Sequence, residues 1–431
     1  MKIALFPFAA VGCGAEFQTL PNPAIYIENG RFVYVGSREE APAFEADETI
    51  ESEHLVAMPG LVNTHTHAGM TLLRGYADDL PLEVWLQTKI WPFEANLQSD
   101  DVYWGTLLAC AEMIRGGTTT FCDMYFHETR GIEASLKTGL RMCPGAVLLG
   151  FLPHADEKIT RSREFLREYR GNDLITPYLA PHSLYTCDES QWHRIIDIAR
   201  EENALISTHV SETQREVADV TAQWGQSPVQ TLLKIGALGG PLLAAHCVVT
   251  DGADRDIMQS TPFRVAHNPQ SNLKLASGIA PVDDYLKRGI VVGLGPDGTA
   301  SNNNLDMWEE MRLAATLHKV ATGDATSVSA QQALQMATIE GARCLSLESE
   351  IGTLEVGKRA DCVLVDFDKS HLYPRHNIVS HLVYSAGASD VHSSLVGGKF
   401  LLRNGAFQTF DAAETYRECE MRSQHLARLA G

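Results

Sequence analysis

Histidines and an aspartate stand where imidazole and carboxylate groups could bind a metal ion. His65 and His67 follow a short apolar run, and in an extended backbone side chains two residues apart leave the same face. His209, His246 and Asp297 each end a later apolar run. A single histidine is more often a core or surface residue, so the case depends on all of them sharing one edge of a sheet. Three neutral imidazoles and a carboxylate suit zinc, and other divalent first-row metals are possible.

A further carboxylate, Glu212, lies three residues after His209. At this spacing its side chain could reach whatever sits on the metal ion. A carboxylate beside a metal-bound water can pass a proton between that water and a substrate nitrogen. The pattern therefore indicates a hydrolytic enzyme.

The candidate ligands lie at the ends of short apolar runs. The chain has eight such runs, and segments with helical periodicity separate most of them. Such alternation over roughly 250 residues predicts a (β/α)8 barrel, in which the active site lies at the carboxyl ends of the strands. Ser99 is expected to cap one helix, and a capping box of Thr186 and Glu189 is expected to open another. The runs are 59–67, 118–122, 141–150, 174–181, 204–209, 242–246, 263–267 and 290–297.

The two ends of the chain have β character without helices between the strands. Residues 1–57 alternate apolar and polar side chains around hairpin signals, and the pattern returns over 351–410. We expect these segments to form one small β-sandwich domain, beside a barrel at 58–350. Residues 411–431 are expected to form a terminal surface helix.

Composition limits the partners and the location of the protein. The formal charge of −19 argues against nucleic acid and anionic membrane surfaces as partners, and no apolar run is long enough to span a bilayer. The nine cysteines are scattered, as expected for a cytoplasmic protein. The run from Lys2 to Cys13 superficially resembles a short export signal, but Pro7 interrupts it and a strand pattern follows directly.

Several motifs together resemble the amidohydrolase superfamily, in the branch that holds one metal ion. More narrowly, they are similar to the 5′-methylthioadenosine/S-adenosylhomocysteine deaminase family. The motifs are Pro59-Gly-Leu-Val-Asn-Thr-His-Thr-His67, His209-Val-Ser-Glu212, Ala245-His246, Asn268-Pro-Gln-Ser-Asn-Leu-Lys274 and Gly295-Pro-Asp-Gly-Thr-Ala-Ser-Asn-Asn303.

The resemblance implies roles for the candidate residues. One divalent metal ion, with zinc favoured, would be held by His65, His67, His209 and Asp297. The reaction implied is hydrolytic deamination of an adenine nucleoside, with water attacking C6 and ammonia leaving. Glu212 would protonate the ring N1, Asp297 would take the proton of the water, and His246 would orient the nucleophile without being a ligand.

The resemblance also implies contacts with a small-molecule nucleoside substrate. Glu94 would bind the ribose hydroxyls, His182 would bind substrate at the end of the fourth strand, and Ser301 could touch the purine beside Glu212 and Asp297.

One departure from the family bears on the substrate. Members that accept S-adenosylhomocysteine carry an arginine near the end of the third strand, where this chain has the apolar segment 145–150. We therefore expect methylthioadenosine, adenosine or 5′-deoxyadenosine to be preferred. An apolar wall for a methylthio group could come from Tyr76, Leu82, Trp85 and Trp91, although core packing is the better explanation of any one of them.

Other functions stay open at this point. A guanine or pterin deaminase, or a triazine chlorohydrolase, would share the barrel and most ligands. Glu94 favours a ribosyl substrate over these, because a free base offers no paired hydroxyls. A metal-free scaffold protein is the alternative of another class, and a homo-oligomer is compatible with the sequence.

Overall fold

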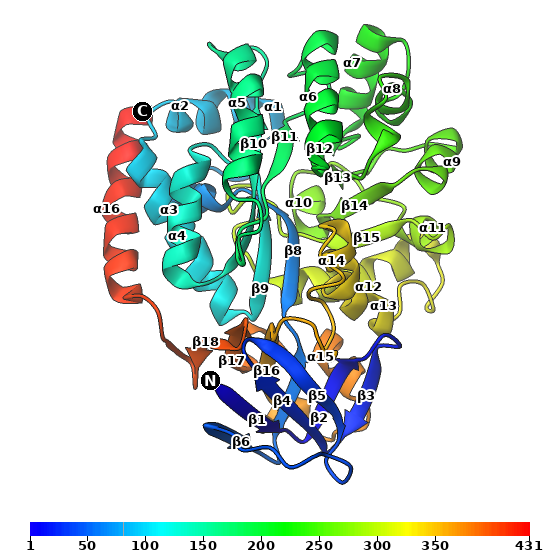
Figure 1. The fold of residues 1–431 in the computed structure, drawn as a ribbon. Helices are drawn as coiled ribbons and strands as arrows, with labels where there is room; N and C mark the ends of the chain where they lie inside the picture. The colour runs from blue at the N-terminus through cyan, green and yellow to red at the C-terminus, as the bar shows by residue number, and fades with distance from the viewer. Residues whose placement is uncertain (81) are drawn as a thin grey trace.

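The structure is a computed structural model that describes residues 1–80 and 82–431, with the backbone alone at residues 82 and 83. A barrel of parallel strands forms its centre (Figure 1). Within the described residues, eight strands follow one another in chain order around the barrel. The barrel closes at a parallel bridge between Thr66, which ends β8, and Asp297, which follows β15. The strands are β8 (Leu61–Thr66), β9 (Thr118–Asp123), β10 (Arg141–Leu148), β11 (Tyr178–Pro181), β12 (Ile206–Val210), β13 (Leu242–His246), β14 (Phe263–His267) and β15 (Val291–Leu294).

Helices cover the outside of the barrel, so that its strands are buried on both faces. Strands buried on both faces appear in the sequence as continuous apolar or β-branched runs. The predicted (β/α)8 barrel is confirmed. The helices after each strand are η1 (Ala68–Leu73), α1 (Leu82–Trp85), η2 (Leu86–Ile90), α2 (Trp91–Glu94), α3 (Ser99–Arg115), α4 (Glu128–Thr138), α5 (Ala155–Glu168), α6 (Glu189–Glu202), α7 (Gln214–Trp224), α8 (Pro228–Lys234), η3 (Ala237–Gly239), α9 (Gly252–Ser260), α10 (Pro269–Lys274), α11 (Val282–Lys287), α12 (Met307–Thr322), α13 (Ala330–Met336) and α14 (Ile339–Cys344).

Several element boundaries differ by a few residues from the predicted ones. Helix α6 is capped by Asp188, whose side chain accepts from the backbone N–H of Gln191, because aspartate is a better cap than the expected Thr186. Helix α3 is capped by Gln98 instead of Ser99. The fourth strand begins at Tyr178, because the residues before it make only an isolated bridge.

Strands from both ends of the chain form two further sheets below the barrel (Figure 1). In the described part of the chain, one sheet has the order β5-β4-β1-β6 and the other β19-β18-β17-β16-β7-β2-β3. Apolar side chains of both sheets pack in one cluster that includes Ile25, Phe32 and Leu364, as expected for a sandwich. The elements are β1 (Lys2–Phe6), β2 (Ala9–Cys13), β3 (Gln18–Pro21), β4 (Pro23–Glu28), β5 (Arg31–Ser37), β6 (Glu48–Glu51), β7 (Leu55–Pro59), β16 (Cys362–Asp366), η4 (Ser370–Leu372), α15 (Ile378–Tyr384), η5 (Ala388–Asp390), β17 (Val391–Val396), β18 (Lys399–Arg403) and β19 (Ala406–Phe407).

Both ends of the chain therefore contribute strands to the sandwich, as expected. Strand β7 runs across the boundary expected at 57/58, and the exact division of the chain into domains stays a prediction.

The last helix, α16 (Ala412–Ala430), runs along the outside of the barrel beside α3 (Figure 1). Its Arg422 is paired with Asp101 of α3 at 2.8 Å, and its Ser423 hydroxyl donates to the carbonyl of Leu72 at 2.7 Å. A helix long and apolar enough to cross a membrane was not found among the described residues.

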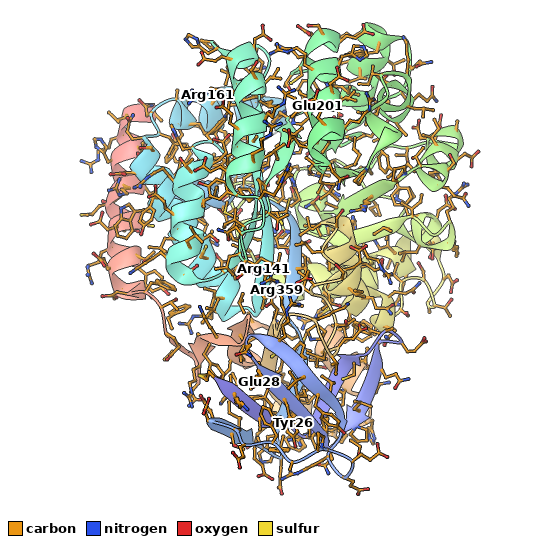
Figure 2. All side chains as sticks on the ribbon, in the orientation of Figure 1. Tyr26, Glu28, Arg141, Arg161, Glu201 and Arg359 are labelled. Carbon is orange, nitrogen blue, oxygen red and sulfur yellow. The ribbon has the colours of Figure 1, made fainter. Side chains whose placement is uncertain are left out.

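A buried ion pair joins the barrel to the sandwich. Arg141 begins β10 and lies where the two parts meet (Figure 2). Its Nε donates to Oδ2 of Asp361 at 2.9 Å and its Nη2 to Oδ1 at 3.1 Å, and both side chains are buried. The N–H of Gly397 donates to the same carboxylate at 2.7 Å. Asp361 thus holds groups from the barrel and from the β17–β18 hairpin.

Removing the guanidinium should destabilise the protein, because the Asp361 carboxylate would be left buried without its counter-ion. We expect Arg141→Met to lower the free energy of unfolding by about 3–5 kcal/mol, measured as a lower urea midpoint in intrinsic fluorescence. Arg200→Met is the control, since Arg200 forms an exposed pair with Asp197. Equal midpoints for the two variants would contradict the importance of the buried pair.

Candidate active site and metal centre

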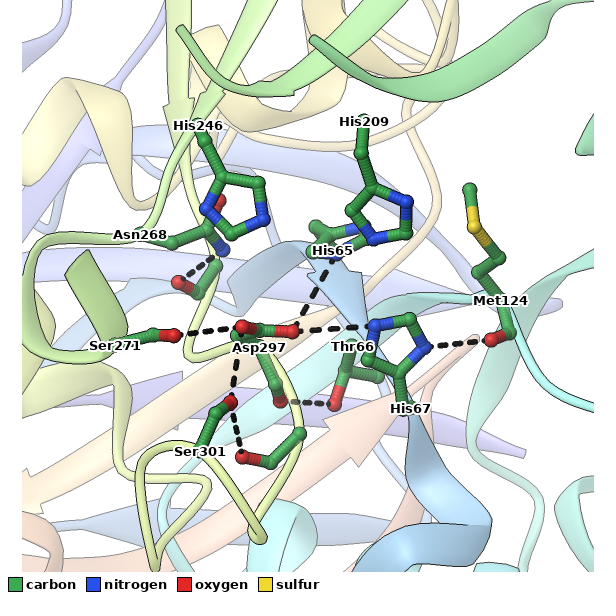
Figure 3. Close-up of polar contacts among 12 residues, drawn as sticks. His65, Thr66, His67, Met124, His209, His246, Asn268, Ser271, Asp297 and Ser301 are labelled. Carbon is green, nitrogen blue, oxygen red and sulfur yellow. Dashed lines mark hydrogen bonds and ion pairs between the residues drawn. The ribbon is translucent and has the colours of Figure 1, made fainter. Parts of the chain in front are cut away.

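The candidate ligands meet at the carboxyl ends of the barrel strands (Figure 3). His65 and His67 lie on and just after β8, His209 lies on β12, His246 ends β13, and Asp297 follows β15. Oδ1 of Asp297 lies 3.2 Å from Nε2 of His67 and 3.5 Å from Nε2 of His65. Residues far apart in the sequence therefore present donor atoms to one point.

Two overlapping groups in this cluster have donor atoms close enough to share an ion. One group is His65, His67 and Asp297, and the other is His65, His209 and His246, with the donor atoms of each within 4.8 Å of one another. Among the described residues, neither ring nitrogen of the buried His65 makes a hydrogen bond, and Nε2 has only the longer contact of 3.5 Å with Asp297. A buried imidazole without a partner is costly unless a metal ion supplies one. The donor set thus fits a divalent metal ion.

Backbone carbonyls orient two of the imidazoles. Nδ1 of His67 lies 2.6 Å from the carbonyl oxygen of Met124, and Nδ1 of His209 lies 2.8 Å from that of His182. A proton on each Nδ1 satisfies these carbonyls and leaves the lone pair on Nε2 for a metal ion.

Burial and charge set the protonation of the cluster. Burial lowers the pKa of His65 to about 4 and that of His209 well below its usual value, so both are neutral near pH 7. Burial also disfavours charge on His67, but the hydrogen bond and charge of Asp297 outweigh it and raise the pKa of His67 to about 9. Because a ligand must be deprotonated, metal binding at His67 would release a proton.

The Asp297 carboxylate is held from its other side by two hydroxyls. Ser271 and Ser301 donate to Oδ2 at 2.7 and 2.9 Å, which leaves Oδ1 facing the histidines (Figure 3). The predicted contact of Ser301 with a purine stays a prediction. Asp297 and His246 both have positive φ, at 64° and 72°. Such strained backbone is concentrated at functional sites, where it aims side chains.

The segment 268–274 supports the site through hydrogen bonds of its asparagine side chains. Asn272 Oδ1 lies 2.8 Å from Nδ1 of His246, and Nδ2 of Asn268 donates to the carbonyl of Gly295 at 2.7 Å. The supporting roles of Ser271 and Asn272 were not predicted from the sequence. Their motif was visible, but only the fold shows which side chains it holds.

The buried carboxylate of Glu310 on α12 joins the segment that carries Gln270 to the loop that carries Asn302. It accepts from the backbone N–H of Gln270 at 3.2 Å and from the side-chain amide of Asn302 at 2.8 Å. Burial raises the pKa of Glu310 well above its usual value. No motif or spacing in the sequence distinguishes this residue.

Glu212 reaches the same centre. Its Oε2 lies 3.8 Å from Nε2 of His246, and burial raises its pKa. Glu216, also missed from the sequence, fixes the turn that carries it by accepting from the backbone N–H groups of Ser211 at 3.0 Å and Glu212 at 2.6 Å. Glu212 is thus available for proton transfer on a fixed backbone.

The predicted substrate residues border the cluster. Glu94 ends α2, and its Oε1 accepts from the Tyr125 hydroxyl at 2.9 Å. Burial raises the pKa of Glu94 to about 7. His182 follows β11, and its ring centre lies 4.7 Å from that of His209. Burial and the neighbouring His67 charge lower the pKa of His182 to about 3, so it is neutral near pH 7.

Other aromatic and histidine side chains have structural partners. His267, at the end of β14, is buried with its Nε2 3.1 Å from Nε2 of His318 on α12. Trp85 is buried and donates to the carbonyl of Ala77, whereas Trp91 is exposed. The Leu82 side chain lies outside the described residues, and the apolar wall stays a prediction.

Comparisons with known proteins agree with this architecture. The model of the amidohydrolase family matches residues 56–401. A 5-methylthioadenosine/S-adenosylhomocysteine deaminase from Desulforudis audaxviator is 48% identical over 93% of this chain and 94% of its own length. The protein therefore belongs to the amidohydrolase family, and the predicted family resemblance is confirmed.

Solved structures share the fold. An adenosine deaminase from Xanthomonas campestris, with bound zinc, is 36% identical and superposes with a TM-score of 0.96 over 99% of this chain and 98% of its own. An atrazine chlorohydrolase from Arthrobacter aurescens has a TM-score of 0.90 over 98% of this chain and 100% of its own. At 22% identity the latter similarity is one of fold alone.

The metal content of variants should distinguish the proposed metal ligands from His246, which is not expected to be one. We expect His209→Ala to lose bound metal, and His246→Gln to keep about one equivalent while kcat falls on the order of 10²- to 10⁴-fold. Both are measured by elemental analysis and nucleoside turnover. Loss of metal in His246→Gln would make His246 a ligand, in keeping with the second group of donor atoms.

Ribose binding should depend on pH if Glu94 binds the diol as a carboxylate. With a pKa of about 7, the ionised fraction of Glu94 is about 0.9 at pH 8 and about 0.1 at pH 6. The KM for adenosine should therefore rise about tenfold between pH 8 and pH 6. Glu94→Gln should have a high KM without this pH dependence. The same dependence in the variant would assign it to another group.

Proposed function

We propose that the protein is a zinc-dependent hydrolytic deaminase that converts adenine nucleosides to the inosine analogue and ammonia. The observation that carries this proposal is that the histidine cluster, Asp297 and Glu212 converge at one end of the barrel. The family membership and the deaminases among the relatives support it.

The metal is proposed to be zinc, held by His65, His67, His209 and Asp297. Imidazole and carboxylate ligands suit zinc, and the Xanthomonas campestris structure contains it. A bound zinc ion lowers the pKa of a water molecule and so supplies a nucleophile near neutral pH.

The protein's own residues are assigned the proton transfers. Glu212, whose pKa burial raises, is assigned the proton that goes to N1 of the purine as water adds to C6. Asp297 stays ionised because the nearby imidazoles of His65 and His67 hold its pKa low in spite of its burial, and it accepts the proton of the water. That proton then passes to the amino group, so that the C6–N bond breaks and ammonia leaves. The proton of the C6 hydroxyl returns to Glu212 as the C6 carbonyl forms. His246, fixed by Asn272, orients the water.

Glu94 distinguishes this function from others on the same scaffold. Held by Tyr125 at the border of the cluster, its carboxylate can accept from two ribose hydroxyls. A guanine or pterin deaminase, or a triazine chlorohydrolase, would have no use for such a group. The substrate is therefore a small-molecule nucleoside. A metal-free scaffold would not need the buried, partnerless His65.

The test is turnover of a substrate panel by zinc-loaded protein, followed by ultraviolet absorbance. We expect methylthioadenosine and adenosine to be converted to the hypoxanthine chromophore, and guanine and a triazine to be unchanged. Glu212→Gln is the matched control, which should keep its metal and lose at least about 100-fold in kcat. Turnover of guanine or the triazine alone would overturn the nucleoside assignment.

A further inference from the structure

Lys274 is the last residue of α10 and joins this helix to two loops of the barrel. Its ammonium group donates to Oδ1 of Asp78 at 2.5 Å, to the carbonyl of Ala300 at 3.4 Å and to Oδ1 of Asn303. An ammonium group has three N–H donors, so these acceptors use all of them. Asp78 lies on the loop after η1, whereas the other two acceptors lie on the loop after Asp297. Lys274 therefore holds three segments at the same end of the barrel.

The loop after η1 makes two contacts with the short helices that lead to Glu94. Nε1 of Trp85 in α1 donates to the carbonyl of Ala77 at 3.0 Å. The rings of Tyr76 and Phe93 lie 5.1 Å apart between centres, and Phe93 is fully buried and directly precedes Glu94 in α2. A displacement of this loop would therefore displace the Glu94 carboxylate.

The backbone around Asp78 depends on tertiary contacts for its conformation. Gly75 and Asp79, on either side of it, have positive φ, at 68° and 58°. Left-handed backbone is costly for a residue other than glycine and persists where surrounding contacts hold it. The ion pair with Lys274 is such a contact, with side-chain exposures of 25% for Lys274 and 37% for Asp78. The hydrogen bond from Lys274 holds the pKa of Asp78 below its usual value, so the pair is charged near neutral pH.

We propose that Lys274 is a positioning residue, which sets the preference of the enzyme for ribosyl substrates by holding Glu94 in place through Asp78. The proposal rests on the proposed deaminase function and on the assignment of Glu94 to the ribose hydroxyls. A carboxylate can accept from two hydroxyls of one sugar only if it is held in the right place before the sugar binds. Lys274 acts on the substrate through this loop, and Glu94 makes the contact.

The test compares adenosine with 2′,3′-dideoxyadenosine, which has no ribose hydroxyls for Glu94 to bind. Asp78→Ala removes only one of the three acceptors of Lys274, so the contacts with Ala300 and Asn303 are kept. In zinc-loaded protein we expect this variant to lower kcat/KM for adenosine about fivefold, the upper range for one partly exposed ion pair. The value for dideoxyadenosine should change less than about twofold, so the ratio of the two should fall.

Two further variants make the test specific. Glu28→Gln removes an exposed ion pair with Lys2 in the sandwich, far from the site, and should leave the ratio as it is in the unaltered protein. Asp78→Asn keeps the size of the side chain and one acceptor oxygen, so the ratio should fall less than in Asp78→Ala. In a protein that already carries Glu94→Gln, Asp78→Ala should lower the ratio no further, because both changes remove the same contact.

The possible failures can be told apart. An equal loss on both substrates in Asp78→Ala, or a further fall of the ratio in the Glu94→Gln protein, would overturn the role of Lys274 and leave the deaminase function intact. Equal kcat/KM for the two substrates in the unaltered protein would overturn the assignment of Glu94 and this proposal with it. Absence of turnover of either nucleoside would overturn the proposed function itself.

Discussion

Asp297 joins the closure of the barrel to the assembly of the site. Its backbone N–H donates to the carbonyl of His65 at 3.1 Å, and its carbonyl accepts from the hydroxyl of Thr66 at 2.7 Å. These contacts connect the last strand to the first. Its carboxylate extends from the same residue toward His65 and His67. The barrel therefore cannot close without bringing this carboxylate to the two histidines.

This closure depends on close backbone approach. A side chain at Gly295 would place its Cβ 2.7 Å from the backbone nitrogen and oxygen of His65, so only glycine allows the strands to meet there. Around the closed end, Ser271, Asn272 and Glu310 fix the orientation of Asp297 and His246. Preorganised polar groups of this kind lose little freedom when substrate binds, which suits a site that must stabilise charge in a transition state.

The barrel and the convergence of the candidate residues could be predicted because both depend on local pattern. Apolar runs that end in histidine or aspartate define strands whose carboxyl ends share one edge, so His65, His209 and Asp297 could be placed together before the fold was known. Helix starts were less precise, since Gln98 and Asp188 compete with neighbouring residues that also cap helices.

Supporting residues could not be predicted, because their roles come from contacts between distant loops. Nothing near Glu310 or Glu216 in the sequence distinguishes them from surface glutamates. Only the tertiary structure buries Glu310 and brings the Glu216 carboxylate to two backbone N–H groups. Only the family resemblance points to Glu94, and no sequence pattern points to its partner Tyr125.

The most direct test of the account is a metal titration of the apoprotein, with methylthioadenosine deamination measured at each step. Two overlapping groups of donor atoms share His65, and we assign one ion to His65, His67 and Asp297 together with His209 of the other group. Activity should therefore be absent without metal, rise linearly with added zinc and reach its plateau at one equivalent. Activity in metal-free protein, or a plateau only at two equivalents, would contradict a single metal ion as the centre of this site.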